Sequence, residues 1–303
     1  MSKSKLIISF ALIALGLLAG CGSDDSIDNP VVPREPTVHQ VTVSEYLQAN
    51  PVMSPDGNWI LFESDAAGSM DIYRVPVAGG DPERLTDDPA FDSSATWTAD
   101  GAEIVFESDR DGPKHLYLLT LDNPLAEPFA LTGGPYQDGS PMASRNGATI
   151  VFESNREKAD GSDLWTIPAG GGDLTRVTVT AEGVYNRTAD WSPDGTKLVY
   201  ESNRSGQSAL YVQPLAGGAA VRITPESGYE GHPAWSPDGK MIAYESTITG
   251  RSELYAVAAT GGDTLRLTVQ GGYWPRFTPD ASGIIYSVVG DASAGIWLME
   301  VDF

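Results

Sequence analysis

A short turn motif recurs six times along this chain of 303 residues, and no other feature limits the possible folds as strongly. Each copy has Ser or Thr first and Asp or Asn third, and five of the six copies end in glycine. The third residue is Asp56, Asp100, Asn146, Asp194, Asp238 and Asp280, in steps of 44, 46, 48, 44 and 42 residues. Proline and glycine in such a motif favour a tight chain reversal. A period of this length predicts one supersecondary unit repeated six times.

Each repeat contains the same four predicted strands. An inner strand ends just before the turn, for example at Trp97. The second strand is apolar on both faces, as in Ile60-Leu61-Phe62. The third carries an aliphatic–aromatic pair, as in Leu116-Tyr117, and an outer strand ends in threonine, as in Arg84-Leu85-Thr86. Four short strands of this kind make one blade of a β-propeller. The predicted fold class is therefore all-β, a six-bladed β-propeller of four-stranded antiparallel blades.

The sixth repeat reaches Phe303 just after its third strand, which would leave an exposed edge in the ring. At the other end of the chain, residues 38–43 resemble residues 174–179, which form a predicted outer strand. The threonines that end the outer strands are Thr42, Thr86, Thr132, Thr178, Thr224 and Thr268, at steps of 44, 46, 46, 46 and 44 residues. Thr42 is thus in register with no blade before it. We expect this N-terminal strand to complete the last blade and close the ring, so that residues 37–303 form the propeller.

The first 36 residues predict secretion and membrane anchoring. Lys3 and Lys5 precede an apolar run over residues 6–19, which is typical of a signal peptide and too short to span a bilayer. Leu18-Ala19-Gly20-Cys21 resembles the bacterial lipobox, which implies a lipoprotein signal peptide over residues 1–20 and lipidation, including palmitate, at Cys21. Cys21 is the only cysteine, so it has no disulfide partner within the chain. Residues 21–36 are acidic and proline-rich, and we interpret them as a disordered tether.

The residue after the lipidated cysteine influences the destination of bacterial lipoproteins. An aspartate there tends to retain the product in the inner membrane, whereas this chain has Gly22. The resemblance therefore implies anchoring to the outer membrane, on its periplasmic or its surface face. The chain carries 41 acidic and 19 basic residues, a formal net charge of −22, which repels nucleic acid and anionic lipid head groups. We expect no nucleic-acid partner and a monomeric protein.

The repeat consensus Trp-Ser-Pro-Asp-Gly, Glu-Ser-Asn/Asp-Arg, Leu-Tyr and Arg-Leu-Thr resembles the WD40-like repeat of the TolB propeller superfamily over residues 37–303. Related repeats occur in peptidases and in oligogalacturonate lyases. The peptidases carry a Gly-x-Ser-x-Gly nucleophile elbow, which is not found outside the blades. The lyases hold a divalent metal with several histidines in the channel. This chain has only His39, His115 and His232, and by register the first two should not reach the axis. We expect no catalytic residue, no metal site and no cofactor.

The residues that should face the central channel provide the candidate binding site. Counting three positions before the end of each inner strand gives Asn50, Ser94, Ser140, Thr188, His232 and Trp274. Counting five positions before gives Gln48, Asp92, Asp138, Asn186, Glu230 and Gly272. We predict two concentric rings at the channel mouth, with Arg187 and Tyr273 among them. Specific ligand binding and a merely water-filled polar lining remain alternatives.

Three further hypotheses concern small groups of side chains. Asp92, Asp138 and Glu230 could together hold a hard cation, and Arg187 could balance the surrounding acids. Tyr229, Tyr273 and Trp274 could stack on a sugar or clamp a peptide side chain. Glu63, Glu107, Glu153, Glu201 and Glu245 recur in five blades, which indicates a structural role, with Arg110, Arg156 and Arg204 as expected ion-pair partners.

These observations favour a membrane-anchored scaffold of the cell envelope that binds a protein or peptide through one propeller face without catalysis. The alternative is a carbohydrate-binding or polysaccharide-degrading, lyase-like envelope component. Because one fold of this kind carries many functions, the repeats themselves do not choose between them.

Overall fold

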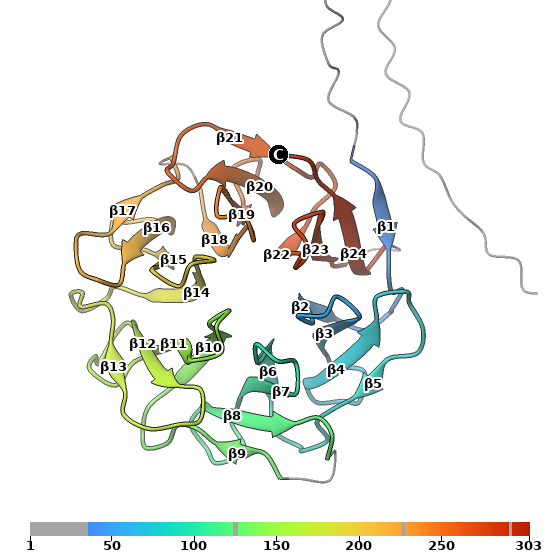
Figure 1. Cartoon of the computed structure of the whole chain (residues 1–303), viewed down its shortest axis with the longest axis horizontal. Coiled ribbons are helices and arrows are strands. Elements are labelled where there is room, and N and C mark those ends of the chain that lie inside the picture. The colour runs from blue at the N-terminus through green and yellow to red at the C-terminus, as the bar shows by residue number, and fades with distance from the viewer. Residues whose placement is uncertain (1–35, 124–126, 226–227, 291–292) are drawn as a thin grey trace, which may run out of the picture. The chain divides into compact units, whose positions relative to one another are not determined.

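The computed structural model describes residues 36–123, 127–225, 228–290 and 293–303, and it confirms the six-bladed propeller (Figure 1). Six separate four-stranded antiparallel sheets are arranged around a central axis, with the first strand of each repeat innermost. The described residues form strands and no helix, so none of their segments could cross a membrane as a helix. The predicted signal peptide, Cys21 and most of the tether lie outside the described residues.

Each blade is a meander in chain order. Blade 1 comprises β2 Gln48–Met53, β3 Trp59–Ser64, β4 Asp71–Pro76 and β5 Glu83–Arg84. Blade 2 comprises β6 Asp92–Trp97, β7 Glu103–Ser108, β8 His115–Thr120 and β9 Phe129–Ala130. Blade 3 comprises β10 Asp138–Ala143, β11 Thr149–Ser154, β12 Asp163–Pro168 and β13 Thr175–Arg176.

The remaining blades follow the same plan. Blade 4 comprises β14 Asn186–Trp191, β15 Lys197–Ser202, β16 Ala209–Pro214 and β17 Val221–Arg222. Blade 5 comprises β18 Glu230–Trp235, β19 Met241–Ser246, β20 Glu253–Ala258 and β21 Thr264–Arg266. Blade 6 comprises β22 Tyr273–Phe277, β23 Gly283–Val288 and β24 Gly295–Glu300, with β1 Val38–Gln40 as its outer strand.

The ring closes as the threonine spacing predicts. Strand β1 pairs antiparallel with β24, with Val38 opposite Met299, so one blade combines both ends of the described chain (Figure 1). The Thr42 hydroxyl accepts a hydrogen bond from the backbone N–H of Ile296 at 2.9 Å. The equivalent threonine does the same in every other blade, for example Thr178 with Leu164 at 2.8 Å. The closing strand therefore uses the same contact as the five continuous blades.

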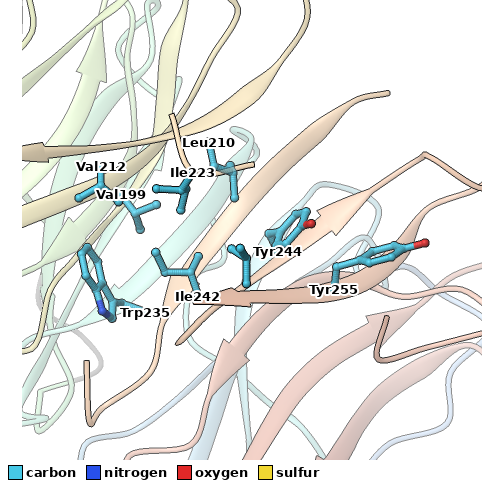
Figure 2. Packing of buried hydrophobic residues seen from close by; sticks show 9 residues of the cluster. Val199, Leu210, Val212, Ile223, Trp235, Ile242, Tyr244 and Tyr255 are labelled. Atoms are coloured by element: carbon cyan, nitrogen blue, oxygen red, sulfur yellow. The ribbon is translucent and has the colours of Figure 1, made fainter. Parts of the chain in front are cut away.

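The hydrophobic core lies between adjacent blades. In the interface of blades 4 and 5, Val199 and Leu210 of one blade pack against Trp235 and Ile242 of the next (Figure 2). All four side chains are buried, and Leu210 and Ile242 are completely inaccessible. Because both faces of each sheet are covered by a neighbouring blade, the second strands are apolar on both sides. Removal of this surface from water is the main stabilising contribution to the ring.

Candidate functional site

Strict antiparallel connectivity gives the propeller two different ends. At the turn end lie the repeated Pro-Asp-Gly turns and the glycine-rich connections between third and outer strands. At the loop end lie the loops between second and third strands and the connections from one blade to the next. The predicted site residues belong to the loop-end half of the inner strands. This end is therefore where the blades can differ without disturbing the turns.

The ring of Asn50, Ser94, Ser140, Thr188, His232 and Trp274 forms a repeated backbone irregularity. Each residue sits where the inner strand shifts register against the second strand, for example between Arg187 and Asp190. All six have left-handed φ angles between 48° and 53°. This conformation is unfavourable for a β-branched residue such as Thr188 and a bulky one such as Trp274. All six side chains are partly exposed, so the structure brings this inner ring together at the channel.

The second predicted ring is not at the channel surface, and that expectation is wrong. Gln48, Asp92, Asp138, Asn186 and Glu230 are all buried, with exposed fractions between 0 % and 6 %. Their side chains point into the blades, where partners are available. Asp138 accepts a hydrogen bond from Arg156 at 2.6 Å, and Gln48 accepts one from Thr42 of the closing strand.

The arginine pairing predicted for the glutamates is also wrong. Arg110 contacts Asp92 at 3.1 Å, Arg156 contacts Asp138, and Arg204 donates to the Asn186 amide oxygen at 2.9 Å. The repeat arginines therefore satisfy the buried ring, not the glutamates. Each lies 18 residues after its partner, so the pairing joins the start of a blade to its own loop.

A single cation site made from Asp92, Asp138 and Glu230 is not formed. Asp92 and Asp138 each have an arginine partner in their own blade. Glu230 lies in another blade beside Thr224, and burial raises the pKa of its carboxyl to about 7. Among the described residues, no three His, Cys, Asp or Glu side chains are grouped closely enough to hold a metal ion.

Two of the recurring glutamates, Glu63 and Glu107, each link their blade to the next one beside the channel. Glu63 accepts a hydrogen bond from Asn50 of its own blade and one from the backbone N–H of Ser94 in the next blade, both at 2.8 Å. Glu107 repeats the second contact with the N–H of Ser140, also at 2.8 Å. The register shift at the inner ring turns these N–H groups toward the preceding blade. The contacts support the structural role predicted from the repetition of these glutamates.

Burial of these carboxyls changes their protonation. Burial, together with the nearby Glu107 carboxylate, raises the pKa of Glu153 to about 7, although the positive charge of Arg187 opposes the shift. Burial likewise raises the pKa of Glu63 to about 7, against the hydrogen bond from Ser94. Glu63 and Glu153 thus gain and lose their protons near neutral pH.

The cavity lined by five of the six inner-ring residues is small. The cavity enclosed by the inner ring has a volume of about 60 Å³, whereas small-molecule sites usually have roughly 300–1,000 Å³. Towards the turn end, Arg276 bonds the carbonyl of Pro233 at 3.0 Å, and Arg145 reaches from blade 3 to the carbonyl of Trp235 in blade 5 at 3.2 Å. These two contacts join a side chain of one blade to the backbone of another near the turn end of the channel.

The three histidines occupy separate positions. His39 lies on the outer strand β1, 3.7 Å from Glu300, and His115 is buried at the start of β8. Only His232 belongs to the inner ring, where its Nδ1 lies 3.2 Å from Glu245.

The His232 imidazole meets the Trp274 indole edge to face, with ring centroids 6.0 Å apart, and the Tyr273 ring centroid lies 5.3 Å from that of the same indole. These partly exposed rings form an aromatic group on blades 5 and 6. Nearby Tyr229 donates a hydrogen bond to Glu201 at 3.1 Å.

On blades 2 to 4, the loop end contains a polar cavity of about 360 Å³, which we name the Arg187 pocket. Its wall includes Lys114, Ser140, Glu153, Tyr185 and Arg187. Lys114 is paired with Glu107 at 2.7 Å. The Arg187 guanidinium lies over the Tyr185 ring at 4.6 Å. Ser140, Arg187 and Asp138, which also lines this cavity, were predicted from the sequence, whereas Lys114 and Tyr185 were not.

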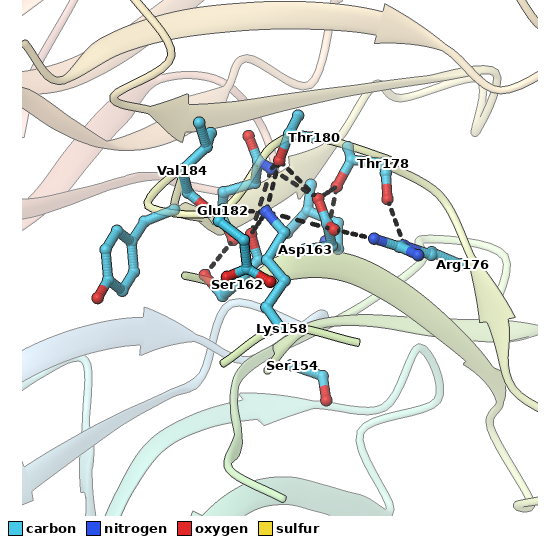
Figure 3. Close-up of polar contacts among 12 residues, drawn as sticks. Ser154, Lys158, Ser162, Asp163, Arg176, Thr178, Thr180, Glu182 and Val184 are labelled. Carbon is cyan, nitrogen blue, oxygen red and sulfur yellow. Dashed lines mark hydrogen bonds and ion pairs between the residues drawn. The ribbon is translucent and has the colours of Figure 1, made fainter. Parts of the chain in front are cut away.

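One side of the Arg187 pocket is the loop between β11 and β12, which Lys158 holds in place (Figure 3). The ammonium of Lys158 donates to Thr180 at 2.6 Å and to the carbonyl of Val184 at 2.8 Å, and its side chain is only 2 % exposed. It also lies 3.4 Å from Asp163. The longest step between turns, 48 residues, is the sequence signal of this extended loop. Sequence inspection alone does not indicate that the loop would wall a cavity.

Two known proteins are similar to short stretches of this chain. An uncharacterised protein of Agrobacterium fabrum is 39 % identical over 69 residues, and the Tol-Pal system protein TolB of Francisella tularensis is 31 % identical over 75 residues. These stretches cover 23–24 % of this chain and 24 % and 17 % of the two relatives, so the match spans a quarter or less of each relative.

Solved structures show the same fold at low sequence identity. A TolB-type structure from Agrobacterium tumefaciens has a TM-score of 0.68 at 20 % identity and covers 88 % of this chain and 97 % of its own. An oligogalacturonate lyase from Vibrio parahaemolyticus has a TM-score of 0.59 at 14 % identity, covering 88 % and 93 %. At such identities the likeness extends to the fold alone.

The family model of the TolB β-propeller domain, PD40, matches residues 34–160 and 175–303. The chain belongs to the PD40 family of TolB β-propeller domains.

Proposed function

We propose that this protein is a non-catalytic scaffold of the bacterial cell envelope, anchored to the outer membrane by lipid on Cys21, that binds a protein or peptide at the loop end. The relatives named as Tol-Pal system proteins support a role in the envelope. The matching family model supports a propeller whose surface acts as a binding module.

The observation that carries the proposal is the asymmetry of the inner ring. Its backbone conformation is the same in all six blades, but its side chains are all different except for the serines of blades 2 and 3. A pseudo-symmetric ring needs such differences to recognise one partner in one orientation. Tyr273 and Trp274 are partly exposed at this ring, and aromatic side chains are typical anchors of protein interfaces.

The dispersed histidines support the non-catalytic part of the proposal. His39 and His232 lie on an outer and an inner strand, and His115 is buried within blade 2. A metal centre of several histidines at the axis would require them together. The acidic ring residues are engaged by repeat-wide contacts, which suits structural carboxyls better than an acid–base pair.

The binding surface can be tested with cross-linking of cells that produce tagged protein, followed by purification of the cross-linked partner and a direct affinity measurement. Tyr273→Ala combined with Trp274→Ala should weaken the partner by roughly thirtyfold or more, because buried aromatic anchors dominate binding energy. Leu215→Ala, at the turn end and 38 % exposed, is the control and should leave affinity unchanged. Equal affinity of the aromatic double variant and the unmodified protein would contradict the loop-end assignment.

The same aromatic group suits a sugar ring, which keeps a carbohydrate-binding envelope component as the second candidate. A glycan array probed with the purified propeller distinguishes the two. Saturable glycan binding that is lost in the Tyr273→Ala, Trp274→Ala variant, without any cross-linked protein, would replace the scaffold by the carbohydrate-binding function.

Anchoring is tested separately from binding. Cys21→Ser should move the protein from the membrane fraction to the soluble fraction or leave the signal peptide uncleaved, since acyl chains supply roughly 0.8 kcal/mol of membrane affinity per buried methylene. Unchanged partition of this variant into outer-membrane vesicles would contradict lipid anchoring and leave the loop-end proposal untouched.

A further inference from the structure

In each blade one residue directly precedes the inner-ring residue, and at this position only blade 4 has a charged side chain, that of Arg187. It lies on β14 opposite Glu201 of β15, immediately before the left-handed residue of the inner ring. The equivalent positions of the other blades hold Ala49, Ser93, Gly139, Gly231 and Tyr273. Blade 4 therefore places a long cation where four other blades have a small residue.

The space around Arg187 is kept open by the preceding blade. A Cβ at Gly139 would approach the Glu107 carboxylate to 2.6 Å, so a larger residue there would require Glu107 to move. Glycine there leaves room between blades 2 and 4 for the Arg187 pocket. The volume of about 360 Å³ matches a site for one amino-acid-sized group.

The Arg187 guanidinium has no hydrogen-bond acceptor among the described residues. Its Nε is buried and unpartnered, while the other repeat arginines, such as Arg156 and Arg204, are bonded to buried side chains. Glu153 is near enough to interact with Arg187 through charge but forms no ion pair with it. A guanidinium offers five N–H donors, and a buried donor without an acceptor is unfavourable. The Nε–H is therefore an unsatisfied buried donor, and the terminal amino groups, which form no hydrogen bond with the described residues, are the part of the guanidinium left to meet a ligand in the pocket.

Arg187 is held ready by its surroundings. Its guanidinium lies over the Tyr185 ring, and the Tyr185 hydroxyl donates to Asp160 at 2.5 Å. Asp160 belongs to the loop that Lys158 fixes to the carbonyl of Val184 (Figure 3). The cation is therefore oriented before any ligand arrives, which lowers the entropy cost of binding.

We propose that the Arg187 pocket binds a carboxylate of the partner, either a peptide C-terminus or an acidic side chain. The planar guanidinium matches the two oxygens of a carboxylate in a bidentate geometry. Lys114 and Arg187 are the positive groups of the pocket wall. Of its acidic groups, Glu107 is paired with Lys114, Asp138 is paired with Arg156, and Asp160 accepts from Tyr185, while Glu153 lies beside Arg187. Recognition of a carboxylate stands on the pocket geometry, whereas the choice of a peptide as its carrier rests on the proposed function.

The probes are three N-acetylated tripeptides: trialanine with a free carboxylate, the same peptide with a C-terminal amide, and an amidated peptide with one glutamate. Binding is measured by calorimetry and by the side-chain Nε–H resonance of Arg187 in ¹⁵N NMR spectra. At least one of the two carboxylate peptides should bind saturably and shift that resonance, and the choice between them identifies the source of the carboxylate. The neutral amide should do neither.

Variants link this binding to the guanidinium. Arg187→Gln should weaken the carboxylate peptide roughly tenfold or more, because a charge-assisted bidentate contact is lost. Arg187→Lys, which keeps the charge and serves if the glutamine variant is unstable, should weaken it less. Lys240→Gln removes a cation that is 76 % exposed at the turn end and should change nothing.

Three results would overturn the inference: no binding of either carboxylate peptide, equal binding of the neutral amide, or full binding to both Arg187 variants. Binding of galacturonate without either carboxylate peptide would keep the carboxylate site and overturn the peptide as its carrier. The proposed function fails separately. A cross-linked partner whose affinity is indifferent to Arg187→Gln would leave the scaffold standing without the carboxylate site. Arg187-dependent peptide binding without any envelope partner would do the reverse.

Discussion

The two ends of the propeller use the same repeat in opposite ways. At the turn end, a Ser or Thr hydroxyl donates to the Asp or Asn two residues later in all six copies, for example Ser192 to Asp194 at 2.6 Å and Thr278 to Asp280 at 2.7 Å. At the loop end, equivalent ring positions hold residues as different as Ser94 and Trp274. One end is determined by chain reversal, whereas the other supports side chains that the fold does not require.

The difference teaches where function can reside in a repeat protein. Contacts that recur in every blade, such as the threonine contact made by Thr42, contribute to closure and stability. Side chains that break the repeat without gaining a hydrogen bond or an ion pair, such as Arg187, are not explained by polar contacts that stabilise the fold. Each of the following experiments tests one side of this comparison.

The largest effect is expected from removal of the closing strand. Deletion of residues 37–43 removes β1 and Thr42, exposes the edge of β24 and leaves the Ile296 N–H without its acceptor. We expect a fall in Tm of at least about 10 °C, since one kcal/mol corresponds to only about 2–4 °C in a protein of this size. Deletion of residues 22–34 is the control. Equal melting temperatures for the two deletions in calorimetry would refute closure by this strand.

A smaller effect concerns the pH dependence of stability. Since the pKa of Glu153 is about 7 in the folded protein and its ordinary value is 4.5, the folded state binds more protons between these values. Stability from this group is complete at low pH and is lost as the pH rises towards 7, by on the order of 2–3 kcal/mol. Thermal melts between pH 5.5 and 8 should show this decline.

The matched variants separate Glu153 from the general effect of a charge of −22. Glu153→Gln should make the decline shallower, because the neighbouring Ser140 hydroxyl can bond to an amide as well as to a carboxyl. Glu63 and Glu230, whose pKa values are also raised to about 7, keep part of the decline. Glu83→Gln removes a surface carboxylate whose side chain is 49 % exposed and should keep the slope. The same slope in both variants would remove Glu153 from the explanation.

The turn end should respond equally in different blades. The Ser192 hydroxyl accepts the N–H of Lys197 at 2.9 Å, and Ser54 accepts the N–H of Trp59 at the same distance. Ser192→Ala and Ser54→Ala should each cost about 1 kcal/mol of unfolding free energy, measured by urea titration. Clearly different losses in the two blades would show that the turn end is less uniform than its geometry.

The smallest effect has the opposite sign. Thr188 has a φ of 48°, which a β-branched residue adopts at a cost, whereas asparagine tolerates it. Thr188→Asn should raise the unfolding free energy by about 0.5–1 kcal/mol. Its hydroxyl makes only a long contact of 3.5 Å to Glu201, so little is lost. A lower unfolding free energy for this variant would indicate that packing of the Thr188 side chain contributes more to stability than its backbone conformation costs.

Much of the fold could be predicted from particular residues. The turn repeats and the position of Thr42 were sufficient for blade number, strand order and ring closure, because these depend on local chain reversal and on period. The six inner-ring residues predicted as a set share one backbone conformation and are all partly exposed. The ring that contains Asp92, Asp138 and Glu230 was assigned to the same surface, but these side chains are buried. The sequence does not show that the strand shifts register between these residues and the inner-ring residues two positions later.

The sequence by itself determined the architecture, because turn chemistry and alternating strands act over a few residues and repeat six times. Only the tertiary structure decided which polar residues are partners and which are available. Arg156 and Arg187 are both arginines among acids, yet one is bonded to Asp138 and the other has no acceptor among the described residues. That distinction depends on distances between blades, which arise when the ring closes and which no local pattern encodes.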